Sequence, residues 1–321
     1  MKKSVRITVL FLVMTLFALM TAGCALSSSS KGKRAIDESL SVFTEAPDTK
    51  NTEVIDSEAF ASNENDVSSE SIAENAAIEQ SVVYDHNGIT ITVKGIDYYA
   101  FSGPAINFLF ENNSPTSVTI QSRNVSVNGY MVDPIMSTDV AAGKKSNDSM
   151  TFLRSDLAEA GITTIADIEF SFHIFDADSW DSIDDSDIIR IETSAAKGFQ
   201  FTYDNSGNQV YNDNGIEIVV KGLSEESWMG TDVVIYICNT SNKNVTVQAR
   251  DVSINGFMID PVFSCDVISG KHAIDALSFF RSDLEENGIE RIESMELSFH
   301  VFDTDSWSTV VDTKPITINF D

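Results

Sequence analysis

The chain has 321 residues, and its 49 acidic against 21 basic residues give a formal net charge of −28. This charge excludes binding of DNA or RNA through the phosphates, because no net basic surface exists to neutralise them. Hydrophobic residues make up 42 % of the chain and include 20 phenylalanines, which predicts a folded core. Three cysteines exclude a disulfide-rich scaffold and a multi-cysteine zinc site.

The N-terminus has the pattern of a secretory signal peptide: a basic start, an apolar run over residues 7–20, and small residues before Cys24. The run is shorter than the ~20 residues of a membrane-spanning helix, which argues against a transmembrane anchor. Ala22 and Gly23 directly before Cys24 resemble a bacterial lipobox. We therefore expect cleavage of residues 1–23 and acylation of Cys24, which holds the protein at the membrane from the extracytoplasmic side.

Residues 24–80 are rich in Ser, Glu, Asp, Asn and Ala and contain scarcely any aromatic side chains. Such a segment cannot bury enough apolar surface to offset the entropy lost on ordering. We expect it to be a disordered acidic tether. Removal of the signal peptide takes away three basic residues, so the mature charge becomes −31.

The strongest signal in the chain is an internal repeat. Residues 84–191 align with 211–318 at a constant offset of 127 without a gap, and 49 of the 108 pairs are identical. VNGYMVDP at 127–134 returns as INGFMIDP, and SFHIFDADSW at 171–180 returns as SFHVFDTDSW. A period of this length is that of a whole domain. The sequence predicts two copies of one domain, at residues 81–197 and 198–321.

The sequence of each copy predicts β structure. Residues 88–94 alternate apolar and polar side chains, as in a strand with one buried face. The further strands expected in the first copy are 105–110, 117–127, 130–135, 149–153, 168–175 and 188–192. About seven short strands in some 120 residues predict an all-β fold of two tandem immunoglobulin-like β-sandwiches. The connection at 193–210 is either a free linker or contains an extra strand.

Turn and helix signals support this interpretation. Asn128-Gly129 and Asn255-Gly256 predict type I′ hairpins, whose two central residues both have positive φ. One short helix is expected in each copy, with Ser155 or Ser282 as its N-cap and a glycine closing its C-terminus.

The lipobox, the acidic tether and the repeated NGxMxDP, RSDL and SFHxFDxDSW motifs resemble a family of immunoglobulin-like domains of unknown function in Gram-positive surface lipoproteins. The resemblance covers residues 1–24 loosely and residues 81–321 well. It implies the fold and the location. It transfers no catalytic residue.

Acidic side chains after the SFHxFDxDSW motif are candidates for a metal site. Asp176, Asp178, Asp184 and Asp187 occupy positions 1, 3, 9 and 12 of an EF-type calcium loop. The central glycine of such a loop is missing, and the second copy lacks the last two carboxylates. A polar turn after a buried strand is therefore the favoured interpretation, and no cofactor is expected.

Three further residue sets have a structural and a functional interpretation. His173 and His300 read as structural histidines on the outer faces of strands, since no catalytic motif accompanies them. Arg-Ser-Asp at 154–156 and 281–283 is either a helix cap with an ion pair or an anion clamp. Cys238 and Cys265 are either a disulfide or two buried thiols.

The two copies diverge most between positions 96 and 111, where Gly103 alone matches its counterpart, Gly230. Loops at the ends of a sandwich commonly carry the binding function, and aromatic side chains there stack on sugars or anchor proteins. The candidate binding loop thus contains Tyr98, Tyr99 and Phe101 in the first copy and Trp228 and Met229 in the second.

These patterns predict a membrane-anchored, non-catalytic binding module or spacer at the cell envelope, with an envelope protein or glycan as its partner and no nucleic acid. Two alternatives remain open. One is a hydrolase of envelope material that uses a pair of carboxylates. The other is a surface module stabilised by calcium.

Overall fold

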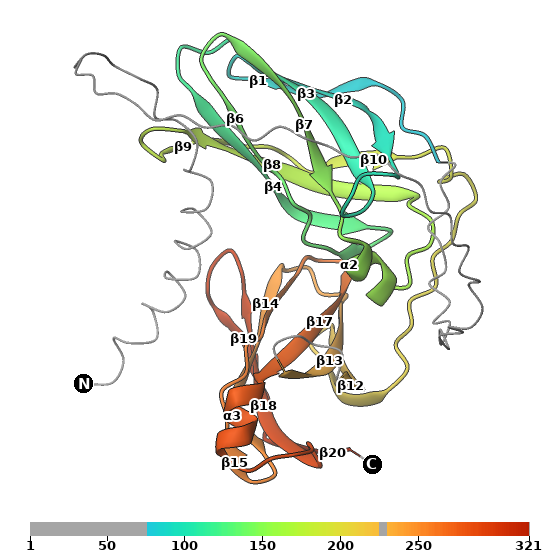
Figure 1. Ribbon diagram of the computed structural model, residues 1–321, viewed down its shortest axis with the longest axis vertical. Coiled ribbons are helices and arrows are strands. Elements are labelled where there is room, and N and C mark those ends of the chain that lie inside the picture. The colour runs from blue at the N-terminus through green and yellow to red at the C-terminus, as the bar shows by residue number, and fades with distance from the viewer. Residues whose placement is uncertain (1–75, 225–229, 321) are drawn as a thin grey trace, which may run out of the picture. The chain divides into compact units, whose positions relative to one another are not determined.

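The computed structural model describes residues 76–224 and 230–320 (Figure 1), which all belong to one compact unit of the chain. The expected signal peptide, Cys24 and the expected tether as far as residue 75 lie outside the described residues, as do Trp228 and Met229. Among the residues described, no helix is long and apolar enough to cross a membrane.

The secondary structure confirms the internal repeat. The first copy consists of β1 (Ser81–His86), β2 (Ile89–Asp97), β3 (Ala105–Asn112), β4 (Val118–Val127), β5 (Tyr130–Met131), β6 (Ser137–Val140), β7 (Lys144–Thr151), α2 (Arg154–Glu159), β8 (Asp167–Asp176), β9 (Ser182–Asp185) and β10 (Ile189–Glu192). The second copy consists of β11 (Asn208–Asp213), β12 (Ile216–Ser224), β13 (Gly230–Asn239), β14 (Val245–Ile254), β15 (Phe257–Met258), β16 (Ser264–Val267), β17 (Lys271–Phe280), α3 (Arg281–Glu286), β18 (Ser294–Asp303), β19 (Thr309–Asp312) and β20 (Ile316–Asn319). Apart from the longer β13 and β17, every element returns with its bounds shifted by 127 residues.

Each copy is a two-sheet sandwich, as expected for the all-β class. In the first copy the antiparallel sheet β1-β2-β3-β7 faces a second sheet built around β4 and β8. In the second copy β11-β12-β13-β17 faces the sheet built around β14 and β18. A single parallel bridge between Tyr130 of β5 and His272 of β17 links a sheet of the first copy to a sheet of the second.

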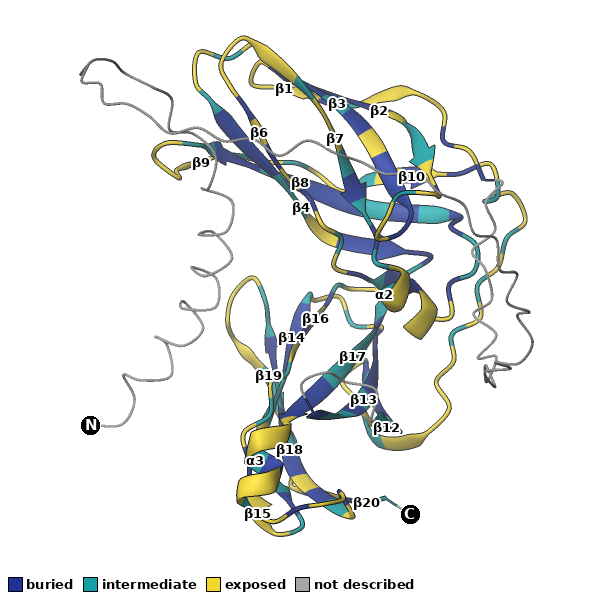
Figure 2. Cartoon of the chain, in the orientation of Figure 1, coloured by how far each residue is buried: buried dark blue, intermediate teal, exposed yellow. Residues whose placement is uncertain are grey.

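The core of the first copy is aromatic. Side chains that alternate along β3 and β8 point inward, so that Phe108 and Phe110 meet Phe170 and Phe172. Figure 2 shows the buried residues along both strands. The ring centroids of Phe108 and Phe172 lie 5.9 Å apart, and the rings meet edge to face. Such a pair contributes about 0.5–1.5 kcal/mol beyond the burial of its apolar area.

The core of the second copy is mostly aliphatic. Ile235, Ile237 and Leu297 are completely or almost completely buried at the positions that Phe108, Phe110 and Phe170 hold in the first copy. The two cores therefore use different side chains on one backbone plan. This is expected where the hydrophobic pattern, and not the identity of each residue, specifies the fold.

The Asn-Gly turns have the predicted geometry. Asn128 and Gly129 have φ of 51° and 85°, and the second copy repeats these values within one degree. The Asn128 side chain also accepts the backbone N–H of Ala166 at 2.9 Å and that of Asp167 at 3.1 Å. The hairpin is thus fixed by its own turn and by the start of β8.

The N-cap prediction is wrong. Both helices begin two residues earlier than expected, at Arg154 and Arg281, with Leu153 and Phe280 as their N-caps, and these N-caps form no side-chain hydrogen bond. The hydroxyl of Ser282 therefore lies inside the first turn, where it donates to the carboxylate of Asp283. The C-terminal prediction is confirmed, because Gly288 has a φ of 68° just after the last turn.

The expected boundary of the tether needs correction. Residues 76–80 were expected to be part of the disordered tether, but Ala76 and Ile78 are buried in the core of the first copy. The Ala77 N–H donates to the Ser194 hydroxyl at 2.9 Å, and the Ser194 N–H donates to the carbonyl oxygen of Ala77 at 2.8 Å. The apolar pair in this acidic segment is sufficient to attach it to the sandwich.

One further expectation differs from the structure, and one of the two alternatives for the connection between the copies is excluded. The strand expected at 130–135 ends at Met131, although the Val132 N–H still donates to the carbonyl oxygen of Val125 at 3.0 Å, and Ile135 makes an isolated bridge to Thr151. The connection between β10 and β11 contains no strand.

Candidate functional site

The divergent loop of the first copy runs from the end of β2 to the start of β3 and is fixed at several points. The Asp97 carboxylate accepts the N–H of Tyr99 at 2.8 Å. The Arg154 guanidinium donates to the carbonyl oxygen of Tyr98 at 2.9 Å, and the Arg154 N–H donates to the carbonyl oxygen of Ser102 at 3.2 Å. These contacts give Arg154 a role that neither sequence interpretation contained, which is to attach the loop to the start of α2.

Gly103 shows why one position of this loop is identical in both copies. A Cβ on Gly103 would collide with the carbonyl oxygen of Phe152, and a Cβ on Gly230 would collide with that of Phe279. The φ of Gly103 is also 152°, which L side chains rarely adopt. Both glycines are therefore retained by the close approach of two backbones, while the rest of the loop is free to vary.

The candidate aromatic residues of the loop separate into two classes. Phe101 is completely exposed, and Tyr99 is 75 % exposed. Tyr98 is buried in the core, so its expected role in ligand contact is wrong. Burial raises the pKa of its hydroxyl, which has no hydrogen-bond partner among the described residues. The usable binding surface of this loop is thus Tyr99 and Phe101.

The acidic turn after β8 is a closed backbone motif. The Asp176 carboxylate accepts the N–H groups of Asp178 and Ser179, both at 2.9 Å, and these bonds hold its pKa below the usual range. Trp180 follows with a φ of 65°, and its ring stacks on Phe175 at a centroid distance of 5.5 Å. The second copy repeats this geometry around Trp307.

The calcium candidates are not brought together as a ligand set. Asp184 accepts the hydroxyl of Tyr84 at 2.5 Å and bonds the His86 ring at 2.8 Å, which lowers its pKa. Asp187 contacts Ser186 through its backbone carbonyl. Within residues 76–224 and 230–320, no three His, Cys, Asp or Glu side chains are grouped so that they could hold a metal ion.

The matched histidines lie against carboxylates of the neighbouring strand. His173 Nδ1 lies 2.5 Å from Asp185, and His300 Nδ1 lies 2.5 Å from Asp312. Each ring also packs on a phenylalanine two residues further along its strand. Each histidine thus joins its strand to the neighbouring strand through a carboxylate.

The two cysteines are free thiols. Cys238 lies in β13 and Cys265 in β16, and both are buried. Burial raises the pKa of each thiol, so neither is an activated nucleophile.

A cluster of rings between the two copies was missed at the sequence level. Tyr203, in the connection between the copies, stacks on His272 at 3.5 Å and donates its hydroxyl to the carbonyl oxygen of Asn128 at 2.9 Å. Tyr130 and Tyr236 complete the cluster, and the Tyr236 hydroxyl lies 2.7 Å from His272 Nδ1. Burial, with a smaller contribution from Lys271, lowers the pKa of His272 to about 4, so the ring is neutral at pH 7.

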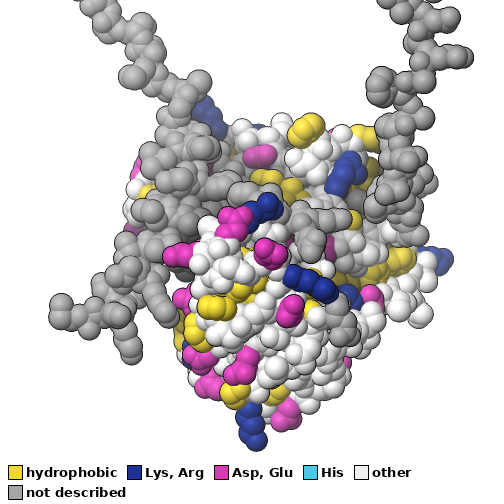
Figure 3. Space-filling model, turned by 60° about the horizontal axis from the view of Figure 1, so that its bottom comes forward, with side chains coloured by type: hydrophobic (Ala, Val, Ile, Leu, Met, Phe, Trp, Pro, Cys, Tyr) yellow, Lys and Arg dark blue, Asp and Glu magenta, His cyan; other side chains and the backbone are white. Residues whose placement is uncertain are grey.

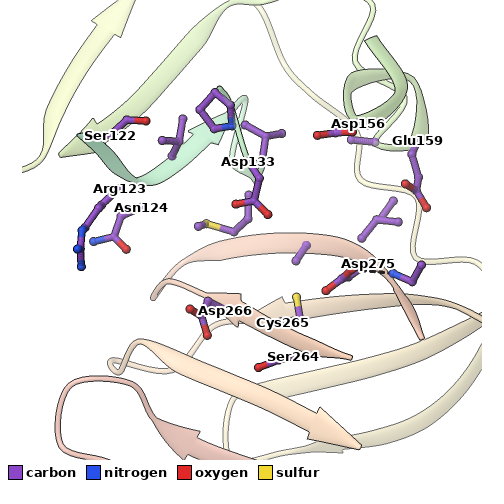
Figure 4. Close-up of a pocket in the computed structure, with 18 residues that line it drawn as sticks. Ser122, Arg123, Asn124, Asp133, Asp156, Glu159, Ser264, Cys265, Asp266 and Asp275 are labelled. Atoms are coloured by element: carbon purple, nitrogen blue, oxygen red, sulfur yellow. Dashed lines mark hydrogen bonds between the residues drawn. The ribbon is translucent and has the colours of Figure 1, made fainter. Parts of the chain in front are cut away.

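An acidic cleft lies beside this cluster. It has a volume of about 470 Å³ and is lined by both copies (Figure 4). Its carboxylates are Asp133, Asp156, Glu159, Asp266 and Asp275, and Arg123 is the one basic residue in this lining. Figure 4 shows the side chains of Asp133 and Glu159 directed toward β17, where Asp275 lies.

Burial changes the pKa of several carboxyl groups in the cleft, and Asp275 has the largest change. Burial raises its pKa to about 6, although the Ala276 N–H and the Cys265 thiol act in the opposite direction. Burial also raises the pKa of Asp133 and of Glu159. Elsewhere on the surface, acidic side chains are scattered among other types on the face shown in Figure 3. The cleft is thus the place where carboxylates with raised pKa values gather.

Comparisons with known proteins give no family. No family model matches the chain, and no curated protein matches it. Among the solved structures that match is the crystal structure of the YadV chaperone, at 11 % sequence identity and a TM-score of 0.22. That match covers 73 % of this chain and 100 % of the other. A TM-score of this size carries no argument about fold or function.

Proposed function

We propose that the chain is a lipid-anchored extracytoplasmic protein of the Gram-positive surface lipoprotein type, whose two sandwiches serve as a non-catalytic binding module or spacer at the cell envelope. The anchor rests on the basic start, the apolar run and the Ala22-Gly23-Cys24 sequence. The binding role rests on the divergent loop of the first copy.

The observation that carries the binding role is the exposure of Tyr99 and Phe101 on a loop whose backbone is fixed. Phe101 is completely exposed, although burial of such a ring would gain about 2 kcal/mol or more. The contacts of Asp97 and Arg154 hold the loop in place, so little conformational entropy is lost when a partner binds.

Rings presented in this way fit two kinds of envelope material. A flat aromatic face stacks on the apolar face of a sugar ring, and an aromatic side chain can also fill a pocket of a partner protein. The two copies diverge most in this loop, where Gly103 alone matches its counterpart. This divergence supports a partner that the loop of the first copy binds and the loop of the second copy does not.

The test uses a chain that begins at residue 25 to capture protein and glycan from the cell envelope. The double variant Tyr99→Ser/Phe101→Ser of the same chain is tested beside the wild type. We expect the wild-type chain to retain a defined component and the double variant to lose at least about tenfold in affinity, as hot-spot aromatic residues do. Val82→Ser/Ile188→Ser is the matched control, because Val82 and Ile188 are also exposed but lie outside the loop. Equal retention by all three chains would overturn the proposal.

The anchor has a separate test. In cells supplied with labelled palmitate, we expect the wild-type chain to carry the label and to sediment with membranes. Cys24→Ala should carry no label and leave the membrane fraction. A labelled or membrane-bound Cys24→Ala chain would contradict lipidation at this residue.

One observation favours a second candidate, a carboxylate-dependent hydrolase of envelope glycans. Acids with raised pKa values in a cleft are candidates for general acid catalysis, and Asp275 with its pKa of about 6 lies in such a place. This activity would be established if the wild-type chain and Asp148→Asn cleave an envelope glycan and Asp275→Asn does not. We expect no turnover from the wild-type chain.

A further inference from the structure

The two copies are joined by a hairpin of the first copy that docks on an edge strand of the second. Tyr130, at the tip of the first Asn-Gly hairpin, is 1 % exposed. The carbonyl oxygen of Gly129 accepts the N–H of His272 at 3.0 Å, and this bond adds the hairpin to β17. The joint therefore has two halves, a hairpin tip and the outer edge of a strand.

The hairpin half is present a second time, but there it is not covered. Phe257 and Met258, which correspond to Tyr130 and Met131, are 47 % and 67 % exposed. A Cβ on Gly129 would meet the Tyr203 hydroxyl, whereas a Cβ on Gly256 would meet nothing within 4 Å. The second copy thus presents the same hairpin, with two large apolar side chains at its tip and no described neighbour over it.

The edge half is also present a second time. β7 corresponds to β17 and is the last strand of the sheet β1-β2-β3-β7. Within the described chain its outer backbone edge makes an isolated bridge, from Thr151 to Ile135, and the Thr138 hydroxyl of β6 donates to the Asp148 carboxylate at 2.8 Å. Lys145 corresponds to His272, so its N–H points away from β3 as that of His272 points away from β13.

We propose that the chain associates with a second copy of itself, head to tail, through its vacant hairpin Asn255–Met258 and the vacant edge of β7 in the next molecule. The hairpin and the edge are different surfaces, so each molecule has one of each to offer. Contacts of this kind are heterologous and extend into open chains of molecules.

The side chains around the two edges set the strength of the contact. At the internal edge lie the rings of Tyr236 of β13 and His272 of β17, whereas the same positions in the first copy hold Leu109 of β3 and Lys145 of β7. Lys145 also forms an ion pair with Glu111, which occupies the position of Cys238. Charged residues on an edge weaken strand addition. The contact between molecules is therefore weaker than the joint within one molecule, and it forms at high protein concentration.

Sedimentation velocity over a concentration series tests this contact in the chain from residue 25. We expect the wild-type chain to pass from monomer to oligomers as concentration rises, and Phe257→Ser/Met258→Ser to stay monomeric. Val82→Ser/Ile188→Ser, which removes exposed apolar side chains elsewhere, should assemble like wild type. A wild-type chain that stays monomeric up to about 1 mM, the weak end of specific binding, would overturn the proposal.

A mixing experiment checks that the contact joins two different surfaces. Lys145→Pro removes the outward N–H of the edge, where proline is tolerated, and leaves the hairpin intact. Phe257→Ser/Met258→Ser leaves the edge intact. An equimolar mixture of the two variants should give one-to-one dimers and nothing larger. Oligomers in either variant alone would contradict a hairpin-to-edge contact.

A gain of association keeps the proposal testable if Lys145→Pro fails to fold. Leu109→Tyr in β3 and Lys145→His in β7 together give this edge the two rings that lie at the internal edge. We expect this variant to assemble at a concentration on the order of tenfold lower than wild type, because each ring pair adds favourable stacking. Unchanged or weaker assembly of a folded variant would count against β7 as the receiving edge.

Discussion

The two Asn-Gly hairpins have the same turn geometry but different surroundings, and the comparison separates what the fold requires from what the neighbours add. In both copies asparagine and glycine adopt positive φ and the asparagine side chain holds the start of the next long strand. The tip of the first hairpin is buried by the second copy, and the tip of the second hairpin is exposed. The turn geometry is therefore determined within each copy, whereas the burial of the first hairpin depends on its contact with the second copy.

The largest expected effect on the free energy of unfolding is at the hairpin tip, where the two copies differ in burial. Tyr130→Ala removes a buried ring from the joint and should lower the free energy of unfolding by about 3 kcal/mol. Phe257→Ala at the matched exposed position should change it by no more than about 0.5 kcal/mol. Denaturant titration at low protein concentration measures both. Equal losses would mean that the hairpins are equally packed.

The second prediction concerns the glycine that the divergent loops of both copies share, Gly103 in the first copy and Gly230 in the second. Gly103→Ala and Gly230→Ala should each cost about 2–3 kcal/mol, because the added methyl group collides with a backbone carbonyl oxygen. Gly143→Ala is the control, since its Cβ would meet nothing within 4 Å and the cost is limited to that of a positive φ, about 1 kcal/mol. In thermal unfolding, the midpoint should fall further for Gly103→Ala and Gly230→Ala than for Gly143→Ala. A larger fall for Gly143→Ala would contradict this prediction.

A third prediction sharpens the comparison between Asp275 and its counterpart Asp148. The pKa of Asp275 is raised to about 6, mainly by burial, so the group binds a proton more tightly in the folded state. Its contribution to stability is complete below pH 4 and is lost as pH rises through 6. Asp275→Asn should therefore stabilise the chain by about 3 kcal/mol at pH 8 and by nothing at pH 4. Asp148→Asn, at the matched exposed position, is the control.

The difference between variant and wild type is the quantity to measure, because His272 titrates in the opposite sense. Its pKa is lowered to about 4, so its contribution is complete above about pH 6.5 and is lost as pH falls through 4. In the wild-type chain the two groups offset each other between these values. A variant-minus-wild-type difference for Asp275→Asn that is flat from pH 4 to 8 would contradict the raised pKa.

The smallest expected effect is that of calcium. The four acidic candidates of the first copy do not converge, and Asp176 and Asp184 are already bonded to N–H and O–H donors. We expect the same unfolding midpoint in excess Ca²⁺ and in chelator. A rise in the midpoint with Ca²⁺ would restore the calcium-stabilised module.

Much of the fold could be predicted because the repeat and the period-two pattern are local properties of the sequence. The hairpins at Asn128 and Asn255 follow from two adjacent residues, and the strands around Phe108 and Phe170 follow from alternation. The N-caps failed because a serine in the first turn of a helix looks the same in sequence as a serine before it.

The joint between the copies could not be predicted, because it depends on contacts between distant segments. Tyr203 lies in a connection without regular structure, and its partners Asn128 and His272 are 75 and 69 residues away in sequence. The burial of Tyr98 is also a tertiary effect, since its neighbours Tyr99 and Phe101 are equally aromatic but exposed. The one available signal was the change from Glu111 and Lys145 to Cys238 and His272, which removes two charges from the matched face.

Amide hydrogen exchange at low protein concentration, at which the chain is monomeric, tests most directly whether one hairpin is docked and its copy is free. We expect the N–H of His272, which donates to Gly129, to exchange slowly, and the matched N–H of Lys145 to exchange fast. The tip at Tyr130 should likewise be protected, and the tip at Phe257 should not. Equal exchange at the two matched pairs would contradict a joint built from the first hairpin and the edge of β17.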